Sequence, residues 1–515
     1  MKLNYRKTIF VGFAFFLICA FWQAYDTIIP KILIDQFGMS QANSGIIMAL
    51  DNILALFLLP LFGMISDKCR NKFGKRTPFI FIGTILASIF LIVLSFISNK
   101  QLKIISIASE IDDRVSLSNL YDAEKDYVLT SPEGKSFQLN NEFSKEDFVK
   151  ISCQIQDGDN IITNPLYSNY VVPARQHYAH RTVTSSPSTL ILFITVLVLL
   201  LISMAVFRSP AVALMPDVTI KPLRSKANAV INLMGTFGAI IVLGLGIVFK
   251  TGNIRNSLMS YTGFFSIVSA IMLVSLLAFL IFVNEPKLVS EMRQESKSYG
   301  ISEEEGNKET SKLTKEKMRS LLFILSSVVF WYMGYNAVTS KYSVYADKVL
   351  SIDYNSTLMI ANVAAIISYI PVGLLASKIG RKKSIVSGVV LLGISFGIAS
   401  FLRESSSPVI MNIMFAFAGI GWATINVNSF PMVVELSHNS DIGKYTGFYY
   451  TASMAAQTIT PWLSGLLMDK VGLTALFPYA TVFVMLSFVT LLFVKHGDNK
   501  PANSGPMLEM FDVED

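Results

Sequence analysis

The chain has 515 residues, of which 52% are hydrophobic and 15% charged, and its mean hydropathy is +0.51. Soluble domains carry about 25% charged residues, so this composition excludes a soluble enzyme, a disordered chain and a secreted disulfide scaffold. A net charge of +7 would suit a nucleic-acid binder only if the basic residues shared one folded face, and here they lie between long apolar runs.

Twelve apolar runs are long enough to cross a membrane as helices. About 20 apolar residues span the hydrocarbon core, because a helix rises about 1.5 Å per residue. The chain is therefore predicted to be an all-α polytopic membrane protein. The runs lie at 8–30, 44–66, 78–98, 188–212, 227–249, 260–283, 318–339, 357–376, 384–402, 408–434, 445–468 and 472–494.

Two polar segments divide these runs. Segment 99–187 follows the third run, and the helix count places it outside the cell. We expect a small β-rich or partly ordered cap there, with a hairpin at 127–139; a substrate-capturing module is the alternative. Segment 284–317 is a cytoplasmic linker. The predicted domains are a six-helix bundle at 1–283, a second at 318–495 and a cytoplasmic tail at 496–515.

Basic residues show the orientation of the chain. With the N-terminus inside, the cytoplasmic segments hold most of the 43 Lys and Arg residues. Because positive loops stay in the cytoplasm, both termini are predicted to be cytoplasmic, in a multi-pass protein of the cell membrane.

A short motif recurs at equivalent places in the two halves. The second run ends in Gly63-Met-Ile-Ser-Asp67-Lys68, followed after an expansion by Gly74-Lys75-Arg76. The eighth ends in Gly373-Leu-Leu-Ala-Ser377-Lys378-Ile-Gly380-Arg381-Lys382. Both copies resemble the signature G-x-x-x-D-[RK]-x-G-[RK]-[RK] of the major facilitator superfamily, whose two six-helix halves alternate access.

The resemblance implies that this motif gates the transporter and does not bind substrate. The second copy has Ser377 in place of the acid, which predicts a weaker gate interaction in the second half. The implied gating residues are Gly63, Asp67, Gly74, Lys75, Arg76, Asp217, Gly373, Gly380 and Arg381.

Two segments of the first half carry a narrower resemblance. Segment 59–80 and the stretch Arg208-Ser-Pro-Ala-Val-Ala-Leu-Met-Pro216-Asp217 are similar to sucrose transporters and to glycoside–pentoside–hexuronide cation symporters. Sodium-using members of the latter carry acids on helices 2 and 4. This chain keeps Asp51, but it has Ala55 one turn later and Arg208 on helix 4. The departure favours a proton over sodium as the coupling ion, and no cofactor is expected.

Three charged residues lie deep inside the apolar runs, namely Asp26, Asp51 and Arg208. Each costs about 2.5–3.5 kcal/mol on insertion scales, so such residues are functional candidates by default. If both acids face one cavity, their repulsion favours protonation of one near neutral pH, as a proton carrier requires. Arg208 would hold one carboxylate after its proton leaves, provided that the helices tilt or that one conformational state brings the two together. The alternative is that all three have only structural hydrogen bonds or ion pairs.

Aromatic and amide side chains in the runs are candidates for sugar contacts, because aromatic faces stack on pyranose rings and amides bind hydroxyl groups. The alternative for each aromatic residue is packing against lipid or at the membrane interface. The predicted substrate-binding residues are Trp22, Gln23, Tyr25, Trp331, Tyr335, Asn336, Asn362, Trp422 and Gln457.

No catalytic or nucleotide-binding pattern is present in the sequence. The four histidines lack metal spacing, the three cysteines lack paired spacing, and there is no P-loop. We therefore expect a non-enzymatic, monomeric proton symporter of a di- or oligosaccharide, with lipid and a sugar as its partners and no nucleic acid. The alternatives are an exporter of drugs or metabolites and a non-transporting nutrient sensor.

Overall fold

The computed structural model describes residues 3–496 apart from 107–109, 133, 158–159, 221–222, 299–314 and 435–441. Its first half contains six long helices around one apolar core, which includes Phe21, Phe193 and Phe265. These helices are α1 (Tyr5–Lys31, continued by the π-helix η1, Ile32–Gln36), α2 (Gln41–Lys68), α3 (Thr77–Ile104), α9 (Ser188–Val218), α10 (Arg224–Val248) and α11 (Thr262–Phe282).

The second half repeats this arrangement around its own core, which includes Trp331, Tyr342 and Phe477. Its first helix also continues into a π-helix, as α1 does. The helices are α13 (Lys315–Tyr345, continued by η5, Ala346–Leu350), α14 (Tyr354–Ile379), α15 (Arg381–Ala399), α16 (Pro408–Val434), α17 (Ile442–Val471) and α18 (Leu476–Leu492).

Ten of the described helices are long and apolar enough to cross a membrane. They coincide with ten of the twelve predicted runs. The other two runs, 357–376 and 445–468, correspond to α14 and α17, which are long helices of the bundle but do not reach that measure over their described residues. The all-α architecture predicted from hydropathy is confirmed.

The two halves meet along three helix pairs, in which α2 packs against α17, α10 against α14 and α1 against α13. The first pair is very close: a Cβ on Gly45 would lie 2.2 Å from the carbonyl oxygen of Pro461. Small residues permit such close approach of helices in membranes. A cavity beside one of these helix pairs can therefore be lined by side chains from both halves.

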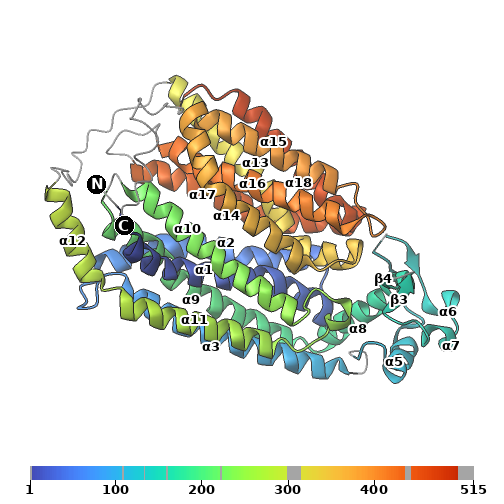
Figure 1. The fold of residues 1–515 in the computed structure, drawn as a ribbon. Coiled ribbons are helices and arrows are strands. Elements are labelled where there is room, and N and C mark those ends of the chain that lie inside the picture. The colour runs from blue at the N-terminus through green and yellow to red at the C-terminus, as the bar shows by residue number, and fades with distance from the viewer. Residues whose placement is uncertain are drawn as a thin grey trace.

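The insertion after α3 lies at one end of the bundle, called here the insertion end (Figure 1). It has its own core, in which Leu120, Phe148 and Tyr167 are buried. The predicted hairpin is confirmed, since Leu129 pairs with Phe137. Its elements are α5 (Arg114–Glu124), β1 (Leu129–Thr130), β2 (Ser136–Phe137), α6 (Leu139–Glu142), α7 (Lys145–Phe148), β3 (Gln154–Asp157), β4 (Asn160–Thr163), η2 (Tyr167–Val171) and α8 (Val172–Ser185).

The expectation of a β-rich cap was wrong, because most of these elements are helical. In α5, Leu117, Leu120, Tyr121 and Glu124 are buried at helical spacing, so one face of that helix packs inward. The segment predicted as a linker also begins as a helix, α12 (Glu285–Ser298). Figure 1 shows α12 at the opposite end of the bundle, called here the terminal end, where α1 begins.

Candidate functional site

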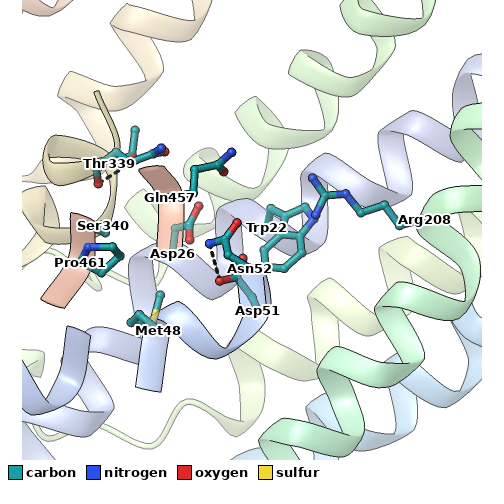
Figure 2. Close-up of a pocket in the computed structure, with 11 residues that line it drawn as sticks. Trp22, Asp26, Met48, Asp51, Asn52, Arg208, Thr339, Ser340, Gln457 and Pro461 are labelled. Atoms are coloured by element: carbon teal, nitrogen blue, oxygen red, sulfur yellow. Dashed lines mark hydrogen bonds between the residues drawn. The ribbon is translucent and has the colours of Figure 1, made fainter. Parts of the chain in front are cut away.

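A cavity lies between the two halves, and both contribute side chains to it (Figure 2). The first half supplies residues from α1, α2 and α9, and the second half supplies residues from α13 and α17. The lining residues are Trp22, Asp26, Met48, Asp51, Asn52, Arg208, Asn336, Thr339, Ser340, Gln457 and Pro461. All three charged residues that the sequence places inside apolar runs therefore reach the same space.

The two carboxylates of this cavity come from neighbouring helices. Trp22 and Asp26 share a face of α1 because they are four residues apart. Asp51 projects from α2, and its Oδ1 accepts a hydrogen bond of 2.7 Å from Nδ2 of Asn52. Within the described part of the chain neither Asp26 nor Asp51 forms an ion pair. The cavity thus holds two acids that no basic side chain of the described residues neutralises by direct contact.

Arg208 reaches this cavity from α9 and lies over an aromatic ring. Its guanidinium carbon is 5.3 Å from the ring centre of Trp22, a cation–π arrangement. Its charge acts on both Asp26 and Asp51 without direct pairing. Arg208 and the two carboxylates therefore line the same cavity.

Three of the nine predicted sugar contacts line the cavity, namely Trp22, Asn336 and Gln457. Tyr25 packs edge-on against Trp22, with ring centres 5.3 Å apart. Trp422 stacks on Tyr335, with ring centres 3.7 Å apart. The predicted contacts that do not line it are Gln23, Tyr25, Trp331, Tyr335, Asn362 and Trp422.

Trp331 shows why the sequence alone could not identify which aromatic and amide residues line the cavity. It is fully buried in the core of the second half. A membrane helix inside a bundle is apolar on most faces, so its sequence does not reveal which face lines a cavity. Thr339 and Ser340 also line the cavity and were not predicted. The prediction of Asn336 could have been extended to them, because they follow it at helical spacing on the same helix.

The first copy of the recurring motif assembles at the terminal end of the bundle. Arg76 is buried there and donates to both predicted acids, with 2.5 Å from Nη2 to Asp67 Oδ1 and 2.8 Å from Nε to Asp217 Oδ2. Burial lowers the pKa of Arg76, but the bonds to Asp217 and Asp67 outweigh it and raise the pKa above its ordinary value. The three side chains join the ends of α2 and α9 to the start of α3.

Glu285, which was not predicted, completes this assembly. Its buried carboxylate accepts hydrogen bonds from the backbone N–H groups of Lys75, Arg76 and Thr77 at the start of α3. A carboxylate suits this place because the first N–H groups of a helix lack partners within it. Gly74 precedes them with φ +110°, and a Cβ there would lie 2.2 Å from that carboxylate.

The remaining motif glycines lie at a helix contact, within a helix and at a helix end. A Cβ on Gly63 would lie 3.0 Å from the hydroxyl oxygen of Ser209. In the second copy Gly373 lies within α14, and Gly380, with φ +91°, ends that helix immediately before Arg381 begins α15.

The insertion end is joined across the halves by polar contacts, some of them buried. Asp469 of α17 accepts hydrogen bonds from the backbone N–H groups of Gln41 (3.0 Å) and Ala42 (2.8 Å), at the start of α2. The ammonium group of Lys341 donates to the carbonyl oxygen of Gln41 at 2.7 Å. Asn355 donates to the hydroxyl oxygen of Thr251 at 3.1 Å. The halves are therefore held together at this end.

Protein-family models match a segment in each half of the chain. Residues 350–509 match the model of the Major Facilitator Superfamily, and residues 10–111 match the model described as MFS/sugar transport protein.

Curated relatives match over part of the chain. An uncharacterized MFS-type transporter of Methanocaldococcus jannaschii is 29% identical over 180 residues, which are 34% of this chain and 44% of that protein. The sucrose transport protein SUC3 of Arabidopsis thaliana is 40% identical over 63 residues, 12% of this chain and 11% of that protein. The chain thus spans less than half the length of these relatives.

Solved structures match over nearly the whole chain. The inward-open xylose transporter XylE of E. coli has a TM-score of 0.58 at 13% identity, with 96% of this chain and 97% of that chain covered. A D-xylose-proton symporter has a TM-score of 0.57 at 13% identity, with 96% and 99% covered. At such low identity these likenesses establish the fold.

Proposed function

Because the chain is a multi-pass membrane protein with the major facilitator fold, we propose that it is a secondary active transporter that couples sugar uptake to proton entry. The cavity between the halves carries this proposal. It brings two carboxylates, a guanidinium over an indole ring and several amide or hydroxyl groups to one place. Both termini would lie in the cytoplasm of the cell, and the transporter would act as a monomer.

The lining chemistry supports a sugar as substrate. Asn52, Asn336 and Gln457 offer amide groups, and Thr339 and Ser340 offer hydroxyl groups, which together can bind the many hydroxyls of a glycoside. Trp22 offers an aromatic face, although Arg208 already lies over that ring in this state. The resemblance to sucrose transport proteins favours a di- or oligosaccharide.

The carboxylates support proton coupling. Two acids that share a desolvated cavity repel each other when both are ionised, so one proton binds favourably between them. Arg208 would hold the acid that has lost its proton and release it on protonation. Sodium would need several oxygen ligands without a cation beside them, and Arg208 lies in the same cavity.

Counterflow in proteoliposomes tests the substrate class directly. Vesicles preloaded with unlabelled α- or β-glucosides should accumulate the matching labelled sugar, and Gln457→Ala should reduce this exchange. The matched control is Gln138→Ala, which removes a half-buried amide of the insertion that does not line the cavity. Exchange of amphipathic cations without exchange of any sugar would indicate an exporter, and sugar binding without exchange would indicate a sensor; either result contradicts the proposal.

A further inference from the structure

Two buried ion pairs join the halves at the insertion end. Lys31 Nζ lies 3.2 Å from Asp347 Oδ2, and Lys348 Nζ lies 3.2 Å from Asp35 Oδ1. None of the four side chains is more than 9% exposed. Each pair connects the end of α1 or η1 in one half with η5 in the other, so the pairs must separate if the halves part at this end.

The elements that carry these pairs occupy equivalent places in the two halves. Both α1 and α13 change to π-helix for five residues, at Ile32–Gln36 and Ala346–Leu350. Such π-helical turns are rare and frequently mark functional sites. Asp35 lies in one of these segments, and Asp347 and Lys348 lie in the other.

The insertion contacts the same segment of the first half. Gln176 of α8 donates through Nε2 to Oδ1 of Asp35 at 3.4 Å, the oxygen that also accepts from Lys348. Two residues after η1, Gly38 has φ +64°, and a Cβ there would lie 2.3 Å from the carbonyl oxygen of Gln176 and from the backbone nitrogen of His180. Helix α8 therefore packs directly against the chain that follows Asp35.

The insertion is also fastened to the first half at a second place. Arg255, in the loop after α10, donates to Asp112 at 3.3 Å, and Ile254 beside it belongs to the core of the insertion. With contacts both at η1 and at the loop after α10, the insertion can hold η1 relative to the rest of its half. It thus fixes the position of the carboxylate that Lys348 of the other half must reach.

The two ion pairs Lys31–Asp347 and Lys348–Asp35 form a gate between the halves at the insertion end. We propose that the insertion 99–187 is a clamp on this gate. By holding Asp35 through Gln176, it stabilises the state in which the halves are closed there and so sets how often that end opens. The proposal rests on the alternating access proposed above, but it does not depend on which solute is carried.

Distances between the halves test this clamp. Spin labels at Ser260 and Ser405, both exposed near the insertion end, report separation of the halves in a chain whose three cysteines are replaced. Gln176→Ala should increase the ratio of the long-distance to the short-distance population, by up to about tenfold, because Asp35 is then no longer held where Lys348 reaches it. Gln176→Leu, which removes the amide donor but keeps a side chain of similar size, should increase it as well.

Two matched variants complete the experiment. Gln138→Ala, in the same insertion but away from the gate, should leave the distances unchanged. Lys348→Met should shift them as Gln176→Ala does, and the double variant should show less than the sum, because both act through Asp35. The proposal is overturned if Lys348→Met separates the halves while neither Gln176 variant does. The labels need no sugar, so a failure to transport any sugar would leave this result standing.

Discussion

Arg208 is the residue whose contacts connect the charge of the cavity to its aromatic wall. In this state it lies over Trp22 and forms no ion pair within the described residues. The hypothesis that it holds a deprotonated carboxylate places that contact in another step of the transport cycle. This hypothesis rests on the observation that Asp26, Asp51 and Arg208 line one cavity.

Arg208→Ala should therefore reduce uptake driven by a pH gradient by roughly tenfold or more. A tenfold change corresponds to a shift of one unit in the pKa of a carboxylate that takes part in coupling. Counterflow, which needs no gradient, should be reduced less. Labelled sugar uptake in proteoliposomes measures both quantities in one preparation. Retention of full gradient-driven uptake by Arg208→Ala would show that the guanidinium takes no part in coupling.

Asp112 in the insertion gives a prediction about pH. Burial raises its pKa, but hydrogen bonds from Cys153 and Arg255 outweigh this and lower the pKa below its ordinary value near 3.8. Since the folded pKa is lowered, the stabilisation is complete above pH 4 and is lost as the pH falls through the folded value. Asp112→Asn should therefore destabilise the insertion at pH 7 and differ less from the natural chain at pH 3.

Limited proteolysis of the insertion across this pH range measures the effect. Asp126→Asn, an exposed acid of the same insertion, serves as the control. The same contacts raise the pKa of Cys153 to about 12, through burial and then the hydrogen bond to Asp112, so this thiol should resist alkylation at pH 8. A destabilisation by Asp112→Asn that is as large at pH 3 as at pH 7 would contradict the account.

At the scale of elements, the start of α3 depends on a carboxylate from the beginning of α12. Glu285→Gln should weaken the three backbone contacts and Glu285→Ala should remove them, at a cost of about 2–3 kcal/mol for hydrogen bonds to a charged group. Thermal unfolding in detergent should show a lowered midpoint for both. Glu295→Ala, an exposed acid on the same helix, should leave the midpoint unchanged; equal effects of Glu285→Ala and Glu295→Ala would contradict the capping role.

The same element shows the limit of sequence reasoning. The motif predicted Asp67, Arg76 and Asp217 as gating residues, and the structure brings the three together. Glu285 is about 210 positions away from the residues it binds, and no local pattern marks it. The ion pairs of Lys31 and Lys348 escaped prediction for the same reason, because each joins residues more than 300 positions apart.

At the scale of the whole molecule, hydropathy was sufficient for the helix order and for the break between the halves. A membrane-spanning helix needs a run of about 20 apolar residues however the helices pack, because the thickness of the membrane sets this length. The cavity was predicted only in part. The three charges were found because charge in a membrane is costly, whereas the faces of apolar helices carry no such signal.

The buried pair Lys31–Asp347 provides a prediction about how the halves are joined. Lys31→Met leaves a buried carboxylate without a cation and should cost about 3–5 kcal/mol, whereas Lys31→Met with Asp347→Leu should recover most of this loss. Thermal unfolding of the two variants measures the difference. A double variant as unstable as the single one would show that the pair is not a unit.

Proton movement that depends on sugar is the central claim, and one measurement tests it most directly. In proteoliposomes without an imposed gradient, addition of α- or β-glucosides outside should draw protons inward, which is recorded as alkalinisation of the external medium. Asp51→Asn should abolish this signal while Asp126→Asn should preserve it. Sugar entry without proton movement, or an unchanged proton signal in Asp51→Asn, would contradict the account.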